Sequence, residues 1–207
     1  GDPARVIALL WGRGTTKGRS GLSLDAVVRA SVELADEAGI GVVSMRRIAD
    51  RLGVGAMSLY SHVPGKAELI DLMVDRVNGE VDYGFAQEPA PAWWRSGLEQ
   101  VADTNWNLLD RHRWLLDVDI TRPTLGPGTT GKYDAELRPL VGTGLDDVEV
   151  DQVLGLILEH VRSSARQAFS ADLAAAEESH ADWWGQAGPL LAGLIDPERF
   201  PLSSRIG

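Results

Sequence analysis

Apolar side chains recur every three to four positions over most of the chain, which is the spacing of one face of an amphipathic helix. The clearest such stretch is residues 24–38, and its inward positions are Leu24, Val27, Val28, Ser31, Leu34, Ala35 and Ala38. Ser23 is a candidate N-cap for this helix, and Gly39 and Gly41 can end it. Alternating, strand-like patterns are scarce, so the chain is predicted to be all-α, with eight to ten helices.

Further helices follow the same spacing, and glycine or proline residues separate them. They are predicted over residues 44–52, 56–61, 66–81, 92–111, 132–141, 147–175 and 181–195. Ser44 is a candidate N-cap for the helix over 44–52, and Asp146 and Glu149 form a capping-box pattern at the start of the helix over 147–175. Gly188-Pro189 is expected to interrupt the last helix.

Two of the predicted helices are short and flank the tight turn Gly53-Val54-Gly55. This order of elements is that of a helix-turn-helix, whose second helix can enter the major groove of DNA while the first crosses the phosphates. The polar side chains expected on the outer surface of this segment, residues 44–62, are Arg46, Arg47, Arg51, Ser58, Tyr60, Ser61 and His62. A plain structural corner would show the same pattern, so the pattern alone leaves both interpretations open.

The charge divides the chain into a basic start and an acidic remainder. The whole chain has a formal charge of −10, which argues against nucleic acid as a partner. Residues 1–66, however, hold nine basic and six acidic side chains, whereas residues 67–207 hold eleven and twenty-four. Residues 12–22 are rich in glycine and in basic side chains and lack apolar spacing, which predicts a flexible arm. A polyanion is therefore expected to bind near the N-terminus.

Residues 24–73 resemble the N-terminal DNA-binding domain of the TetR family of bacterial transcriptional regulators. The positions that carry the resemblance are Leu34–Gly39, Ser44–Val54, Leu59–Val63, Lys66 and Leu69. A similarity to the tetracycline-repressor branch continues through Arg113-Trp114-Leu115-Leu116 and Thr121-Arg122-Pro123-Thr124. The resemblance implies a homodimeric repressor that binds a palindromic operator and releases it when a small molecule enters the C-terminal domain.

On this basis the chain is divided into a flexible basic arm (1–22), a helix-turn-helix domain (23–66) and a ligand-binding and dimerisation domain (67–207). Carried over position by position, the DNA contacts fall on Arg46, Arg47, Ala56, Met57, Ser58, Tyr60, Ser61, His62 and Lys66. Tyr60 packing on the first helix and His62 capping a turn are the structural alternatives. Ala56 stands where the tetracycline repressor has a glutamine that reads a base, so the operator sequence is not transferable.

The ligand pocket is expected in the C-terminal domain, where six of the seven tryptophans lie beyond residue 90. The candidate pocket residues are Met73, Trp106, Trp114, Asp119, Arg122 and Tyr133. Asp82 and, approximately, Val118 stand at the positions that match the tetracycline repressor's magnesium-binding histidines. Tetracycline–magnesium is therefore not the expected inducer, and no cofactor is predicted. The acidic residues around His180 fit a solvated helix end better than a metal site.

Residues 126–132 read GPGTTGK, which matches the core of a phosphate-binding loop. Tyr133 follows where a serine or threonine hydroxyl would hold Mg²⁺, and the alternating strands of a nucleotide-binding fold are lacking. A disordered connector is the favoured interpretation, and a nucleotide-binding enzyme is the disfavoured one. A ligand-binding sensory module without operator binding is a second alternative.

Missing residue types and segments narrow the class further. The chain has no cysteine, which excludes disulfides, thiolate zinc sites and cysteine nucleophiles. No apolar stretch reaches the roughly 18 to 20 residues that span a bilayer, and Val6–Trp11 is too short for a secretory signal. The protein is expected to be a cytoplasmic DNA-binding regulator and not an enzyme.

Overall fold

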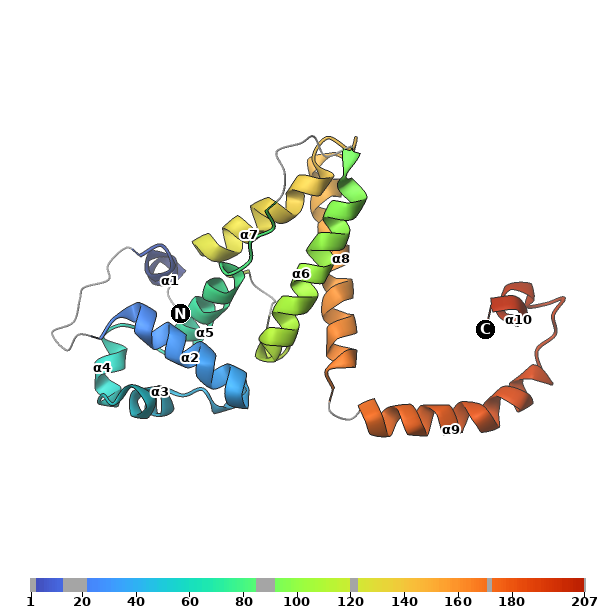
Figure 1. The fold of residues 1–207 in the computed structure, drawn as a ribbon, viewed down its shortest axis with the longest axis horizontal. Helices are drawn as coiled ribbons and strands as arrows, with labels where there is room; N and C mark the ends of the chain where they lie inside the picture. Colours follow the sequence, from blue (N-terminus) through green and yellow to red (C-terminus); the bar gives the residue numbers. More distant parts are fainter. Residues whose placement is uncertain (1–2, 13–21, 85–91, 120–122, 171–172, 207) are drawn as a thin grey trace. The chain divides into compact units, whose positions relative to one another are not determined.

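The computed structural model describes residues 3–12, 22–84, 92–119, 123–170 and 173–206 (Figure 1). All regular secondary structure in these ranges is helical, which confirms the predicted all-α fold. The α-helices are α1 (Pro3–Leu10), α2 (Leu24–Ala38), α3 (Met45–Leu52), α4 (Ala56–Tyr60), α5 (Lys66–Asn78), α6 (Trp94–Arg111), α7 (Pro127–Leu137), α8 (Asp147–Ala168), α9 (Leu173–Ala192) and α10 (Pro201–Ile206). Short 3-10 helices cover Ile40–Val42, Arg113–Asp117 and Arg138–Leu140.

The predicted caps form at three helix starts. The Ser23 Oγ accepts a hydrogen bond from the Ala26 N–H at 3.1 Å, and the Ser44 Oγ accepts one from the Arg47 N–H at 3.3 Å. Asp146 Oδ1 accepts from the Val148 and Glu149 N–H groups, and Glu149 Oε2 accepts from the Asp146 N–H, all at 2.9 Å. The capping box is therefore confirmed, and each cap satisfies N–H groups that a helix start leaves without partners.

The start of the chain differs from the prediction. Residues 3–10 form α1, whose buried side chains Val6 and Leu10 face α5, and the Trp11 Nε1–H donates to the Leu125 carbonyl at 2.9 Å. The prediction of a flexible arm over residues 1–22 is therefore wrong for residues 3–12, because α1 buries its apolar face on the folded unit. Residues 13–21 lie outside the described part.

Helix bounds in the second half also differ from the prediction. The segment 126–132 is not a disordered connector, because α7 begins at Pro127, which suits a first helical position. α8 ends at Ala168, seven residues earlier than expected, and α9 begins at Leu173 and continues through Pro189.

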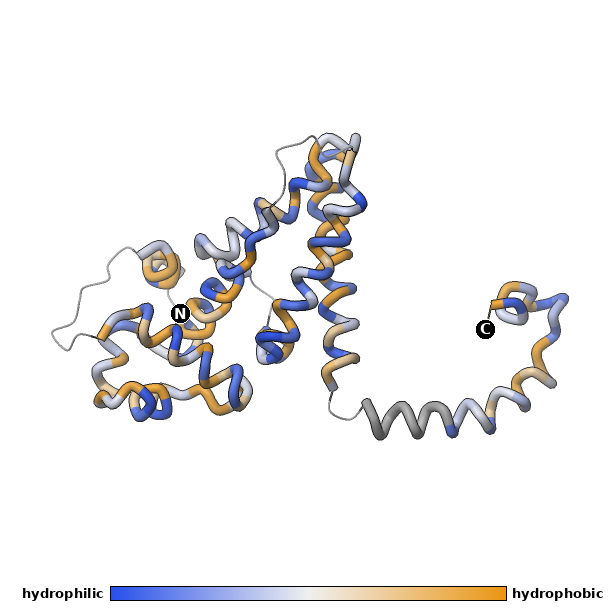
Figure 2. Tube along the Cα trace, viewed as in Figure 1, coloured by the Kyte–Doolittle hydropathy of each residue, from blue (hydrophilic) through white to orange (hydrophobic). Residues whose placement is uncertain are grey.

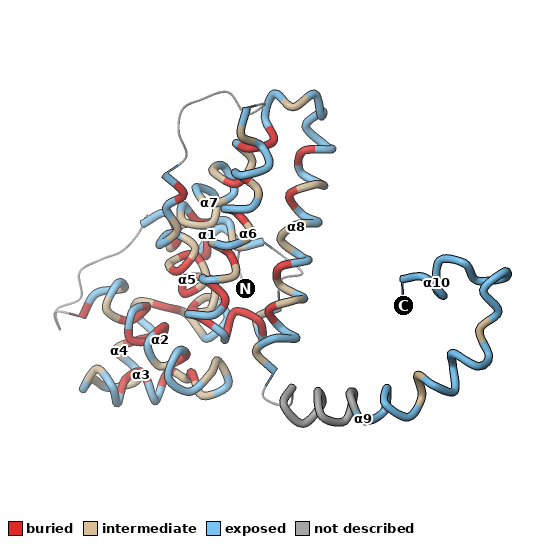
Figure 3. Tube along the Cα trace, turned by 45° about the vertical axis from the view of Figure 1, so that its right-hand side comes forward, coloured by how far each residue is buried: buried red, intermediate tan, exposed pale blue. Residues whose placement is uncertain are grey.

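The chain divides into two compact units, Gly1–Ala165 and Arg166–Gly207. In the first unit, buried positions lie on the inward faces of the helices (Figure 3), and one cluster joins α6 to α8 through Val101, Val150 and Leu154. In the second unit, the described side chains of α9 and α10 are mostly exposed and include many apolar ones (Figures 2 and 3). The predicted domain boundary at residue 66 falls inside the first unit and stays a prediction.

A close crossing of α5 and α7, here called the α5–α7 joint, holds the first unit together. The buried Asp75 carboxylate accepts hydrogen bonds from the backbone N–H groups of Thr129 at 2.8 Å and Gly128 at 3.3 Å. Asn78 Nδ2 also donates to Thr129 Oγ1 at 3.0 Å. A Cβ on Gly126 or Gly128 would come closer than 3.0 Å to Asp75. Asp75 thus caps α7 from a neighbouring helix, where a negative charge meets the positive end of the helix dipole.

Replacing Gly128 by alanine should destabilise the protein, because the added Cβ meets α5 backbone, which has little room to move. We expect the Gly128→Ala variant to lose about 1–3 kcal/mol of unfolding free energy in urea. Gly131→Ala, in the same helix, is the matched control, since its Cβ enters open space. This control should be neutral or slightly stabilising, because alanine favours helix over glycine. Equal stability of the two variants would contradict the close crossing.

Candidate nucleic-acid interface and effector core

The surface of α3 and α4 follows from which of their side chains are buried. Ile48 and Ala49 of α3 and Leu59 of α4 pack into the core of the first unit. Gly53 ends α3 with a φ of 66°, a left-handed conformation that glycine adopts without strain. The turn directs α4 across α3, and the exposed positions of the two helices are Arg46, Arg47, Asp50, Arg51, Met57 and Tyr60.

All nine predicted DNA contacts lie on this surface or beside it. Arg46 and Arg47 are exposed in the first turn of α3, and neither forms an ion pair with another described residue. On α4, Met57 is 80 % exposed and Tyr60 is 44 % exposed, whereas Ala56 and Ser58 are half-buried. Tyr60 thus projects outward and does not pack into the core.

The last three of these residues surround the turn between α4 and α5. The Ser61 hydroxyl donates to the Ser58 carbonyl at 2.7 Å, and His62 is half-buried. Lys66, the first residue of α5, is exposed and reaches the Ile40 carbonyl at 3.4 Å. A lysine at a helix start opposes the helix dipole, which is consistent with a role outside the fold.

Arg51 is absent from the set of DNA contacts, and the structure gives it another role. Its guanidinium lies 2.6 Å from Glu37 and 3.4 Å from Glu33, both on α2. The hydrogen bond from Arg51 lowers the pKa of Glu37, and the same bond raises the pKa of Arg51. Arg51 therefore joins α3 to α2. The i,i+4 spacing of Glu33 and Glu37 on one helix face was the available sequence signal.

α2 is also tied to the end of α6. The Trp114 Nε1–H donates to Asp36 Oδ1 at 2.7 Å, and His112 Nδ1 lies 2.7 Å from the same oxygen. An ionised carboxylate only accepts, so His112 carries its proton on Nδ1 in this contact. His112 Nε2 lies 3.4 Å from Oε2 of Glu80, which follows α5 by two residues. Asp36 thus connects α2, which packs against the helix-turn-helix, with the residues that follow α6. No local sequence pattern indicates this role, because the donors lie 76 and 78 residues away.

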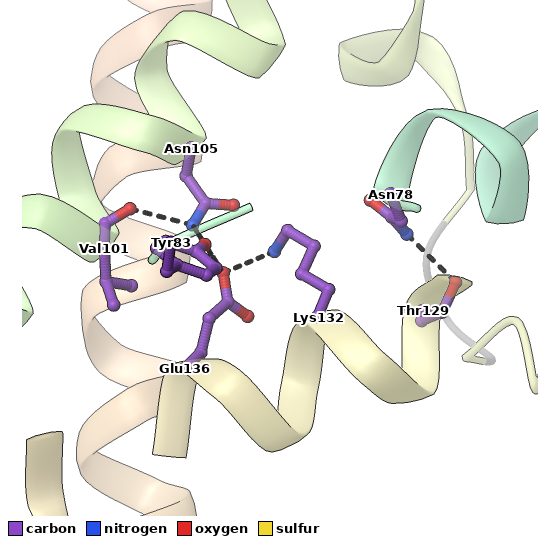
Figure 4. Close-up of polar contacts among 7 residues, drawn as sticks. All are labelled: Asn78, Tyr83, Val101, Asn105, Thr129, Lys132 and Glu136. Atoms are coloured by element: carbon purple, nitrogen blue, oxygen red, sulfur yellow. Dashed lines mark hydrogen bonds and ion pairs between the residues drawn. The ribbon is translucent and has the colours of Figure 1, made fainter. Parts of the chain in front are cut away.

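A buried polar cluster of Tyr83, Asn105, Lys132 and Glu136 lies among α6, α7 and the segment after α5 (Figure 4). Three donors converge on Glu136 Oε1: Asn105 Nδ2 at 2.6 Å, Lys132 Nζ at 2.6 Å, and the Tyr83 hydroxyl. Glu136 is only 2 % exposed, so its charge depends on these partners. Burial and the adjacent Glu136 charge raise the pKa of Tyr83.

The polar cluster was not predicted, although the helix expected over residues 132–141 contains both Lys132 and Glu136. Once the segment is helical, the i,i+4 spacing of Lys132 and Glu136 makes them neighbours on one face. Tyr83 and Asn105 carry no comparable signal, because their partner lies 53 and 31 residues away.

The predicted pocket residues occupy different environments. Met73 is fully buried in α5, Trp106 is half-buried on α6, and Asp119 is exposed. The Trp114 indole bonds to α2 as described. Tyr133 is 42 % exposed, and its hydroxyl donates to Asp151 at 2.7 Å, a bond that raises its pKa.

The remaining pocket candidate, Arg122, lies outside the described residues. The side chain of His180, the disfavoured metal ligand, lies outside them as well. The pocket set as a whole stays a prediction.

The geometry of α7 does not fit a phosphate-binding loop. In such a loop, backbone N–H groups at the helix start hold the phosphates and the lysine reaches them. Here the N–H groups of Gly128 and Thr129 donate to Asp75, and Lys132 is paired with the buried Glu136. Glycines 126 and 128 instead allow α5 and α7 to approach closely.

Among the described residues, no group of three or more histidine and acidic side chains is placed to bind a metal ion. No helix within the described ranges combines the length and the apolar content needed to cross a membrane.

Comparison with known proteins places both parts of the chain in one family. Residues 27–73 match the model for bacterial regulatory proteins of the tetR family. Residues 88–207 match the model for the tetracyclin repressor-like C-terminal domain.

Individual relatives agree with this assignment. The chain is 37 % identical to the HTH-type transcriptional repressor DrrR1 of Streptomyces coeruleorubidus, over all of this chain and 77 % of that protein. It is 27 % identical to the class A tetracycline repressor of Escherichia coli, over 84 % of this chain and 80 % of the relative. ActR of Streptomyces coelicolor, solved in complex with actinorhodin, superposes with a TM-score of 0.69 at 28 % identity, over 87 % of this chain and 81 % of ActR. The chain therefore belongs to the TetR family and is a ligand-responsive transcriptional repressor of that family.

Proposed function

We propose that the chain acts in the cytoplasm as a homodimer that binds a palindromic operator through α3 and α4 of each subunit, and that a small molecule in the C-terminal part releases it. The observation that carries this proposal is the solvent-facing surface of α3 and α4. On it, Arg46 and Arg47 have no ion pair with a described residue, and Met57 projects from the second helix. Arginines at the start of the first helix suit phosphate contacts.

Exposed apolar side chains support a homodimer. Leu156 of α8 is 72 % exposed. In the second unit, the exposed apolar side chains of α9 include Trp183, Trp184, Leu190 and Leu191. Apolar faces of this extent are typical of helical interfaces in two-fold dimers. Two-fold symmetry then sets the operator half-sites about one helical turn apart, roughly 34–36 Å.

The effector is proposed to be an apolar small molecule with a few polar groups. ActR, the structural relative described above, was solved with actinorhodin bound. The pocket residues proposed here are Met73, Trp106, Trp114, Asp119, Arg122 and Tyr133. The polar cluster supplies charged and hydroxyl groups in the same part of the chain, and pockets of this kind combine apolar walls with few polar contacts.

Release is proposed to pass through α5 and α2. α5 begins beside the solvent-facing surface of α3 and α4 and contacts α7 at the α5–α7 joint. α2 is hydrogen-bonded through Asp36 to His112 and Trp114. A ligand that displaces α6 or α7 therefore changes the position of α3 and α4. The ligand must bind the state that cannot bind DNA more tightly than the state that can. The difference in binding free energy is about 1–3 kcal/mol for ordinary coupling.

Operator binding should weaken as salt rises, because phosphate contacts release counterions. The duplexes to use are those recovered by the purified protein from a pool of genomic fragments. Arg46→Ala should reduce the slope of log affinity against log salt by about two, because each subunit of the dimer loses one phosphate contact. Arg138→Ala, which removes an exposed charge outside the helix-turn-helix segment, should leave the slope unchanged.

An unchanged slope for Arg46→Ala would remove Arg46 from the interface. Failure to retain any duplex at low salt, with the protein folded, would favour a sensory module without operator binding.

Analytical ultracentrifugation should give about twice the chain mass of 22.3 kDa at micromolar concentration. Leu156→Arg should shift the protein towards the monomer, because an exposed leucine becomes a charge in the proposed interface. Leu125→Arg, at an exposed leucine outside α8 and α9, is the control and should leave the mass unchanged. A wild-type mass near 22.3 kDa would refute the dimer.

Asp36→Ala should lower the unfolding free energy by about 1–3 kcal/mol, because it leaves the buried His112 and Trp114 donors without their acceptor. Hydrogen exchange should rise together in α2 and at the end of α6. Asp50→Ala, at an exposed position of α3, is the matched control and should stay within 0.5 kcal/mol of wild type, roughly the range for surface substitutions. A faster exchange in α2 alone would show that Asp36 does not link the two helices.

A further inference from the structure

The helix that is proposed to enter the major groove has few side chains for reading bases through hydrogen bonds. α4 consists of Ala56–Tyr60, with the sequence AMSLY. Guanine is typically read by paired bonds from arginine or lysine, and adenine by paired bonds from asparagine or glutamine. α4 contains none of these four residue types, and its hydrogen-bonding groups are two hydroxyls. Base discrimination from this helix must rest largely on apolar contacts.

Met57 is the most exposed apolar side chain of α4. It is 80 % exposed, whereas Leu59, two positions later, is fully buried against the core. Two positions correspond to about 200° around a helix, so Met57 points away from the core. Tyr60, three positions after Met57, lies on the same side and is 44 % exposed. Met57 and Tyr60 therefore form an outward apolar face.

The charges beside this face indicate what covers it. Arg46 and Arg47 are exposed at the start of α3, the helix packed against α4. An apolar face flanked by two arginines is complementary to the major groove of DNA, where thymine methyl groups lie between two rows of phosphates. Thymine presents a C5-methyl group in the major groove, and apolar side chains recognise it by contact. A flexible, polarisable methionine adapts to the uneven surface of such a floor.

We infer that Met57 is a specificity-determining residue that recognises thymine methyl groups in each operator half-site, with the Ala56 methyl beside it. This inference rests on the proposed DNA-binding function and deepens it. The operator then requires thymine at the positions that Met57 contacts, and it requires the methyl group itself and not only the hydrogen-bonding pattern of the A·T pair.

The test replaces each thymine of the recovered duplex by deoxyuridine, which lacks only the C5-methyl group. Affinity should fall about fourfold per contacted methyl, the value for one buried methyl-sized group. The effect should occur at symmetry-related positions of the two half-sites and should be absent elsewhere. If the wild-type protein binds the duplex equally well after every replacement, the inference is overturned while DNA binding stands.

Variants assign the effect to the side chain. Met57→Ala should weaken binding to the thymine duplex and abolish the deoxyuridine penalty, whereas Met57→Leu should retain most of both. Arg46→Ala is the matched control: it should weaken binding to both duplexes equally and keep the penalty. A penalty that persists in Met57→Ala would assign the methyl contact to another residue and overturn the inference. A protein that retains no duplex at all would overturn the proposed function itself, so the two failures are distinguishable.

Discussion

The arrangement of the first unit depends on one buried carboxylate. Asp75 accepts the N–H groups at the start of α7, and this contact fixes where α7 lies on α5. Without an acceptor, those N–H groups would be partly buried and unsatisfied, which is costly. The close crossing also requires residues without a side chain at positions 126 and 128. A sequence that resembles a phosphate-binding loop therefore serves here as a contact between two helices.

The same helix, α5, connects the features that the function needs. Its first residue, Lys66, lies beside the solvent-facing surface of α3 and α4. At its other end it is followed by Glu80, whose carboxylate lies 3.4 Å from His112 Nε2. α7 carries Lys132 and Glu136 of the polar cluster and is bonded to α5 at its own start. In the proposed release, a displacement within the cluster reaches α3 and α4 through these hydrogen-bonded and packed contacts. Packed contacts of this kind transmit small shifts because protein interiors are dense.

The sequence predicted the elements whose signals are local. The helices with a 3.6-residue period, the serine caps at Ser23 and Ser44 and the capping box at Asp146 all formed as expected. The errors came from contacts between distant segments. α1 is ordered by burial on α5, and the start of α7 is held by Asp75, 54 residues before Thr129. The role of Trp114 depends on Asp36, 78 residues away, which periodicity and motif spacing do not reveal.

Asp36 has a consequence for how regulators of this kind can be recombined. Its carboxylate belongs to α2, but both of its donors, His112 and Trp114, come from beyond the predicted helix-turn-helix domain. A chimaera that kept residues 1–66 and took its remainder from another repressor would leave this carboxylate without its donors, unless that remainder supplied a matching histidine and tryptophan. The two halves of this protein are therefore not freely interchangeable modules. Any exchange of DNA specificity would have to carry Asp36 together with a matching histidine and tryptophan.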